Sequence, residues 1–273
     1  MKQPRHSTWA LMLPVCAITL CAVAVSAQTV TVHGRVEVVP ATRSTEKKSE
    51  EQKAGEHRSS SENKSVANKK RHGATPSTVV WLTAAPGSGL ELDPPEPNAQ
   101  ATPRLVQKNK SFEPHLLVVP AGSMVEFPNH DPFFHNVFSL FEGKRFDLGL
   151  YEAGTTRMVR FDRPGISYIF CNIHPEMSAV IITMATPLYA IAGADGQVSI
   201  ANVPPGRYVL HIWSEGMPEN EKPATREITI AENATSLGAI RVPEANGQSM
   251  AHKNKYGREY DAPTPDSSIY KQQ

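Results

Sequence analysis

Four residues with metal-binding side chains stand out in this 273-residue chain. Cys171, His174 and Met177 fall within one seven-residue stretch, and His135 lies 36 residues before the cysteine. One thiolate, two imidazoles and a thioether form a soft donor set, which favours copper or zinc over hard cations such as magnesium. Two histidines and one cysteine with a weak axial methionine is also the arrangement of blue-copper sites, which carry single electrons. Taken alone, each of these residue types is common in an ordinary packed core, but the four together indicate a metal site.

The spacing of these residues suits a single ion. Cys171 is expected to end a strand, after which His174 can turn back toward the same ion and Met177 can lie over it. Pro175 stiffens this loop because its ring fixes φ. His135 begins another expected strand, directly after a tight turn over residues 128–132.

The beginning of the chain indicates export. Residues 1–27 have a basic start, an apolar run and small residues at the end, which is typical of a secretory signal peptide. The alternative is an uncleaved membrane anchor, which Pro14 and Thr19 disfavour because a spanning helix needs about 20 apolar residues. We therefore expect a periplasmic protein with no stable membrane insertion after cleavage.

Export makes Cys171 unusual. Cys16 and Cys21 lie within the predicted leader, so the mature chain keeps a single cysteine and cannot form an internal disulfide. An unpaired cysteine in an oxidising compartment needs to be buried or bound.

Composition narrows the class of protein. The chain has 28 Lys and Arg against 27 Asp and Glu, and its formal net charge of +1 gives no overall attraction to nucleic acid or to an acidic membrane surface. Apolar residues make up 40%, enough for a packed core. The 23 prolines favour short strands joined by turns over long helices.

The pattern of apolar residues predicts an all-β protein with two polar flanks. Short apolar stretches separated by Pro- and Gly-containing turns indicate a sandwich or barrel. Residues 40–75 are predicted to be a disordered charged insertion, or alternatively a basic docking arm, an idea that five glutamates weaken. Residues 244–273 are predicted to be a loose polar tail. The predicted strands lie at 29–39, 77–82, 116–119, 124–127, 137–140, 158–161, 166–170, 179–183, 188–191, 197–200 and 207–213, with two more before 242.

The segment 165–177 resembles the copper loop of the cupredoxins, and its short Cys-x2-His-x2-Met spacing is nearest to the amicyanin and plastocyanin-like members. Further matching motifs lie at 112–114, 120–131 and 135–137, so the resemblance covers residues 102–186. It implies that His135, Cys171, His174 and Met177 hold one type 1 copper ion. It also implies that Asn136 ties the two ligand-bearing segments together.

The remaining strands resemble a carboxypeptidase regulatory-like, prealbumin-type β-sandwich. Their motifs, at 32–36, 79–82, 195–200, 203–208 and 210–213, both precede and follow the copper domain. We therefore expect residues 28–39 and 76–85 to join residues 187–243 in a second sandwich, with the cupredoxin inserted in it. This layout resembles exported bacterial proteins of the methylamine-utilisation-like type.

The expected fold is therefore a cupredoxin Greek-key β-sandwich plus a smaller prealbumin-like β-sandwich. The expected function is electron transfer between periplasmic redox partners, without catalysis, because the chain has no His-x-His or His-Cys-His for further copper centres. The alternatives are copper handling and a non-redox envelope binding module. Phe133 and Phe134 are either core or an apolar docking rim, which Pro175 and Glu176 would extend. The charge of Glu176 would repel an acidic partner or select a basic one.

Overall fold

The computed structural model describes residues 28–39, 76–98, 101–140, 143–217, 222–244 and 252–260. The predicted signal peptide and the predicted charged insertion lie outside these residues. The described part of the chain is built of β-strands and confirms the expected all-β class. The strands are β1 (Val30–Val39), β2 (Thr78–Ala84), β3 (Val106–Lys108), β4 (Ser111–Glu113), β5 (Leu116–Pro120), β6 (Ser123–Pro128), β7 (His135–Ser139), β8 (Phe146–Tyr151), β9 (Thr156–Phe161), β10 (Gly165–Cys171), β11 (Ser178–Met184), β12 (Tyr189–Ile191), β13 (Gln197–Val203), β14 (Gly206–Ser214), β15 (Ala224–Ile230) and β16 (Ser236–Pro243).

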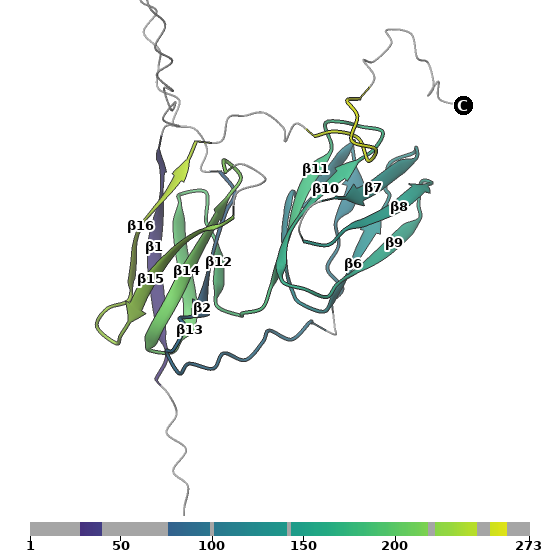
Figure 1. Cartoon of the computed structure of the whole chain (residues 1–273). Coiled ribbons are helices and arrows are strands. Elements are labelled where there is room, and N and C mark those ends of the chain that lie inside the picture. Colours follow the sequence, from purple (N-terminus) through teal and green to yellow (C-terminus); the bar gives the residue numbers. More distant parts are fainter. Residues whose placement is uncertain are drawn as a thin grey trace, which may run out of the picture.

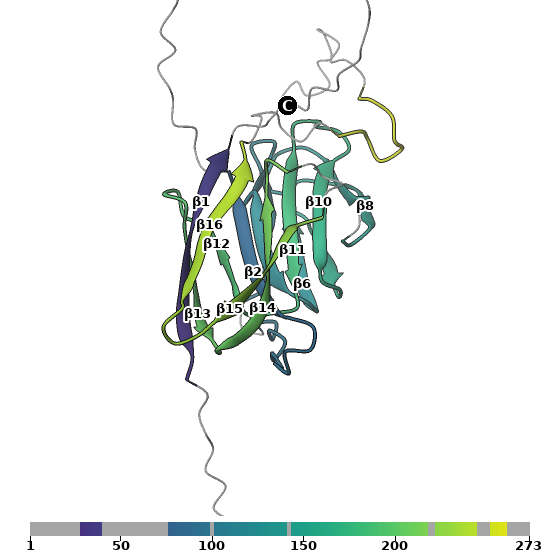
Figure 2. The same ribbon diagram turned by 60° about the vertical axis from the view of Figure 1, so that its left-hand side comes forward.

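These strands form two sandwiches that lie side by side (Figure 1). One sandwich packs the sheet β13-β1-β16 on the sheet β12-β2-β14-β15. The other packs the sheet β5-β11-β10-β7-β8 on the pairs β6-β9 and β3-β4. In the turned view the strands of both sandwiches run close to one direction (Figure 2).

The first two strands pair with the last ones. β1 runs antiparallel to β13 and parallel to β16, and β2 runs antiparallel to both β12 and β14. The chain therefore leaves this sandwich after β2, builds β3 to β11 as the other sandwich, and returns at β12.

A third apolar cluster fills the space between the sandwiches. On β10, Ile169 and Cys171 face the inner core of their own sandwich, whereas Tyr168 and Phe170 face this shared cluster. Val79 and Trp213 meet them from the neighbouring sheet. Because successive side chains of a strand point to opposite faces, a sheet covered on both sides needs uninterrupted apolar strands. This explains why the residues of β11 are buried throughout.

None of the described residues belongs to a helix with the length and apolar character needed to span a membrane.

Candidate metal centre

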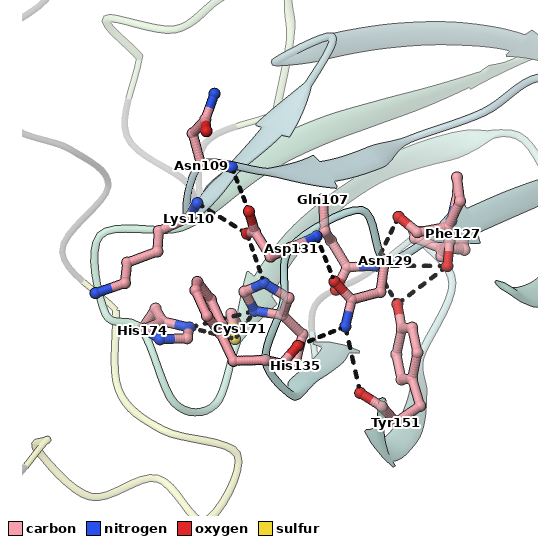
Figure 3. Close-up of polar contacts among 12 residues, drawn as sticks. Gln107, Asn109, Lys110, Phe127, Asn129, Asp131, His135, Tyr151, Cys171 and His174 are labelled. Carbon is pink, nitrogen blue, oxygen red and sulfur yellow. Dashed lines mark hydrogen bonds and ion pairs between the residues drawn. The ribbon is translucent and has the colours of Figure 1, made fainter. Parts of the chain in front are cut away.

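Three of the predicted metal-binding side chains converge at one end of the five-stranded sheet (Figure 3). His135 begins β7 and Cys171 ends the neighbouring antiparallel strand β10, where Cys171 pairs with Val137. The sulfur of Cys171 lies 3.6 Å from Nδ1 of His135 and 3.7 Å from Nδ1 of His174. The two imidazole nitrogens are 3.2 Å apart, and all three residues are buried.

These separations fit a single first-row metal ion. An ion about 2.0–2.1 Å from each imidazole nitrogen and about 2.3 Å from a thiolate sulfur holds its donors roughly 3.3–3.8 Å apart. The two sulfur–nitrogen distances fall within this range, and the nitrogen–nitrogen distance of 3.2 Å lies just below it. Their chemistry, two imidazoles and a thiolate, selects copper or zinc and not magnesium or calcium.

The loop that carries His174 closes back on its own strand. The backbone N–H of Met177 donates to the carbonyl oxygen of His174 at 3.0 Å, and that of Cys171 donates to the carbonyl of Met177 at 3.3 Å. Met177 is 1% exposed and belongs to the same apolar cluster as Cys171. The fourth predicted ligand thus lies buried at the end of this loop.

Asp131, whose role we did not predict from the sequence, orients His135. Nε2 of His135 lies 2.9 Å from Oδ2 of Asp131, so this nitrogen carries the proton and Nδ1 keeps its lone pair toward the cysteine. The carboxylate also accepts the backbone N–H groups of Asn109, at 2.6 Å, and Lys110, at 2.9 Å. Burial alone would raise the pKa of Asp131, but the N–H of Lys110, the His135 ring and the N–H of Asn109 outweigh it and lower that pKa.

The turn before His135 is held by amide side chains. Oδ1 of Asn129 accepts the N–H of Asp131 at 3.0 Å, and its Nδ2 donates to the carbonyl of Phe133 at 2.8 Å. Nearby, Gln107 is hydrogen-bonded to the hydroxyl of Tyr151 (Figure 3). Asp131 therefore contacts the imidazole of His135 from a turn that is stabilised by hydrogen bonds.

The two ligand-bearing segments are joined through the main chain of Asn136. Its carbonyl oxygen accepts the N–H of Asn172 at 3.0 Å. The side chain turns elsewhere, because its Nδ2 donates to Oδ1 of Asp147 at 2.7 Å. Its buried Oδ1 has no hydrogen-bond partner among the described residues.

Burial sets the protonation of the donors. It raises the pKa of the Cys171 thiol, and the backbone N–H groups of Asn136, Ile173 and His174 oppose that rise. Burial also lowers the pKa of both His135 and His174 and keeps the imidazoles neutral, the form that binds metals. A metal ion would displace the thiol proton on binding.

Aromatic and charged side chains border the donors. The half-buried ring of Phe133 lies 5.3 Å from the ring of His135 and 5.5 Å from that of His174, so it is neither core nor a fully exposed rim. Phe134 is 45% exposed, and Pro175 and Glu176 are exposed.

Part of the predicted loose tail packs against this site. Residues 252–260, which we call the C-terminal strap, lie beside the end of β10 and the loop that follows it (Figure 1). His252 and Tyr260 had no spacing relation to the ligands that would have indicated such contact. His130, which lies in the turn before His135, is exposed.

Comparison with known proteins finds similarities among solved structures alone. Neither family models nor curated proteins give a match. The copper-containing nitrite reductase of Thermus scotoductus SA-01 is 25% identical, with a TM-score of 0.29, over 35% of this chain and 27% of that chain. This chain thus spans about a quarter of that enzyme's length. A purple cupredoxin from Nitrosopumilus maritimus is 20% identical (TM-score 0.28), over 30% of this chain and 99% of its own. A reduced amicyanin variant is 18% identical (TM-score 0.30), over 32% of this chain and 85% of its own.

Proposed function

We propose that this chain is an exported, mononuclear type 1 copper protein that passes single electrons between periplasmic redox partners and catalyses no reaction itself. The observation that carries the proposal is the convergence of Nδ1 of His135, Sγ of Cys171 and Nδ1 of His174 in a buried cluster. A copper ion held there would supply the Cu(II)/Cu(I) couple. Residues 1–27 would direct export as a cleaved signal peptide, and Met177 would be the axial ligand.

The surrounding chain would hold the donors in one geometry. Burial excludes water from them, Asp131 fixes the His135 ring, and the Asn136–Asn172 bond fixes the loop. A site that keeps its shape when its charge changes costs little reorganisation, and this favours fast electron transfer over bond-making chemistry. These contacts also favour retention of the metal over the release that a copper carrier needs.

Electrons would enter and leave near His174. This ligand is 7% exposed, more than His135 or Cys171, and is followed by the exposed Pro175 and Glu176. Phe134 would add apolar docking area. We propose that a partner docks here and that Glu176 selects one with a basic surface.

Voltammetry of copper-loaded residues 28–273 tests the function. We expect one reversible one-electron wave, no wave from the zinc-loaded protein because zinc has no redox chemistry, and loss of the wave in Cys171→Ser. Release of copper to a chelator on each reduction, instead of a reversible wave, would favour copper handling.

A further inference from the structure

The C-terminal strap is a folded segment with its own turn. Oδ1 of Asn254 accepts the N–H groups of Tyr256 and Arg258, each at 3.0 Å. The N–H of Gly257 donates to the carbonyl of Asn254 at 2.8 Å, and that of Asn254 donates to the carbonyl of Arg258 at 2.8 Å. Gly257 has a φ of +74°, which a residue without Cβ adopts without strain.

Three hydrogen bonds join the strap to the loop that carries the donors. The hydroxyl of Tyr260 donates to the carbonyl oxygen of Cys171 at 2.8 Å. The N–H of Lys255 donates to Oδ1 of Asn172 at 2.9 Å. Nε2 of His252 lies 3.0 Å from the carbonyl oxygen of Pro175. The strap therefore holds the main chain on both sides of His174.

The strap also reaches the other ligand-bearing segment. Nζ of Lys255 lies 2.9 Å from Oδ2 of Asp147, whose Oδ1 accepts the side-chain amide of Asn136. Asn136 directly follows His135 in β7. One short segment thus joins the strands of both His135 and Cys171.

Aromatic packing adds to these bonds. The ring of His252 stacks on that of Phe170, with centroids 3.9 Å apart and planes 23° apart. The ring of Tyr260 packs edge-on against His252 at 5.2 Å.

We propose that the C-terminal strap is a positioning element for residues 171–177, which we call the metal loop. In the strap, Tyr260 and His252 hold the Cys171–Pro175 main chain closed over the donor cluster. It sets how readily the Cys171 thiol is exposed and how fast a metal ion enters or leaves. The second consequence rests on the proposed copper site, whereas the first does not.

Alkylation of Cys171 by iodoacetamide in metal-free residues 28–273 tests the positioning role. Reaction of this buried thiol requires the loop to open. We expect about a fivefold faster reaction in Tyr260→Phe, since one hydrogen bond contributes roughly that factor, and a larger increase in Tyr260→Phe/His252→Ala. Tyr256→Phe is the matched control, because this tyrosine lies in the same strap but is 72% exposed and bonds to no residue of the metal loop.

Low concentrations of urea separate a positioning role from general destabilisation. If the strap releases the loop locally, the faster reaction of Tyr260→Phe will not depend on urea below the unfolding transition. An alkylation rate that rises already at the lowest urea concentrations would overturn the proposal. An equal increase of the alkylation rate in Tyr256→Phe would overturn it too.

Copper-loaded protein provides the second readout. We expect faster release of copper to a chelator from Tyr260→Phe than from Tyr256→Phe, together with a wider copper hyperfine splitting. Equal release and identical spectra would overturn the strap's control of the metal. If the unaltered protein shows no thiolate-to-copper band, the proposed function fails, and alkylation alone decides the strap's role.

Discussion

Asp131 determines which nitrogen of His135 faces the cysteine. Its carboxylate accepts a hydrogen bond from the Nε2–H, and the N–H groups of Asn109 and Lys110 hold the carboxylate in place. An imidazole free to rotate would present Nδ1 to the other donors for only part of the time. Partners of this kind contribute to metal affinity although they never touch the metal.

Asp131→Ala should weaken metal binding. We expect the Cu(II) dissociation constant to rise about 10- to 100-fold, because the ring loses its acceptor and its fixed tautomer. Competition with a chelator of known affinity measures the change. Asp162→Ala removes an aspartate whose partner, Lys144, is on the surface, and should have no effect. Equal affinities in the two variants would contradict the role given to Asp131.

Residue type and spacing predict part of this site. His135, Cys171 and His174 can be identified because soft donors at short intervals are rare and chemically specific. Asp131 could not be identified as a partner, because its role depends on how an imidazole ring is turned. His252 and Tyr260 lie some 80 residues beyond the loop, and no local pattern links them to it.

At the scale of elements, β10 and β11 are buried on both faces because each lies between two cores. Ile181 faces the inner core of its sandwich, whereas the neighbouring Val180 and Ile182 face the shared cluster. Strands of this kind anchor the metal loop, since Cys171 ends β10 and β11 begins directly after Met177.

Ile181→Ala should destabilise the protein by about 2–5 kcal/mol, because it leaves a cavity in a fully packed core. Urea denaturation of the metal-free protein measures the loss. Leu150→Ala removes a side chain that is 59% exposed and should cost no more than about 0.5 kcal/mol. A loss below about 1 kcal/mol in Ile181→Ala would show that the core is loosely packed.

Apolar strands were predictable, and irregular edge strands were not. The predicted stretches at 116–119 and 179–183 match β5 and β11 closely. β8 was not predicted, since it pairs with β7 alone, across an irregular register, and contains Gly149 at a φ of +66°. Such a strand carries little alternation for a sequence pattern to detect.

At the scale of the whole molecule, we propose that the two sandwiches are domains. Residues 28–39, 76–85 and 187–243 form one domain, and residues 102–186 form the other, which is inserted in it. The apolar cluster between them is reinforced by polar contacts. The indole N–H of Trp213 donates to the hydroxyl of Tyr168 at 3.4 Å, and Nε2 of His115 lies 2.8 Å from Oε1 of Glu215. Nδ1 of His115 lies 3.0 Å from the carbonyl of Ser178, next to Met177.

Because they share a core, the two sandwiches should unfold together. The tryptophans of residues 28–273 are Trp81 and Trp213, both at the shared cluster, so their fluorescence reports on this interface. We expect the same urea midpoint from tryptophan fluorescence and from far-ultraviolet circular dichroism. Two separated transitions would show that the shared cluster does not couple the sandwiches.

The His115–Glu215 pair should make stability depend on pH. The hydrogen bond that His115 donates to Glu215 raises the pKa of His115 above its ordinary 6.5, so its contribution is full below pH 6.5 and is lost as pH rises through the raised value. The hydrogen bond from His115 lowers the pKa of Glu215 below its ordinary 4.5, so that contribution is lost as pH falls through the lowered value. The pair therefore stabilises the protein most between these two ordinary values.

His115→Gln should accordingly cost more stability at pH 5.5 than at pH 8.5. The difference should not exceed about 1 kcal/mol, because both side chains are partly exposed to solvent. Urea midpoints at the two pH values measure it. The exposed His33 supplies the control His33→Gln. An equal pH dependence of the urea midpoint in the two variants would contradict the role given to the His115–Glu215 pair.

The central claim, a type 1 copper site at His135, Cys171 and His174, is tested most directly by titrating residues 28–273 with Cu(II) while recording optical and EPR spectra. One equivalent should give an intense blue thiolate-to-copper band and a narrow copper hyperfine splitting, and Cys171→Ser should give neither. A colourless protein, or one that prefers zinc and shows no thiolate band, would contradict the account.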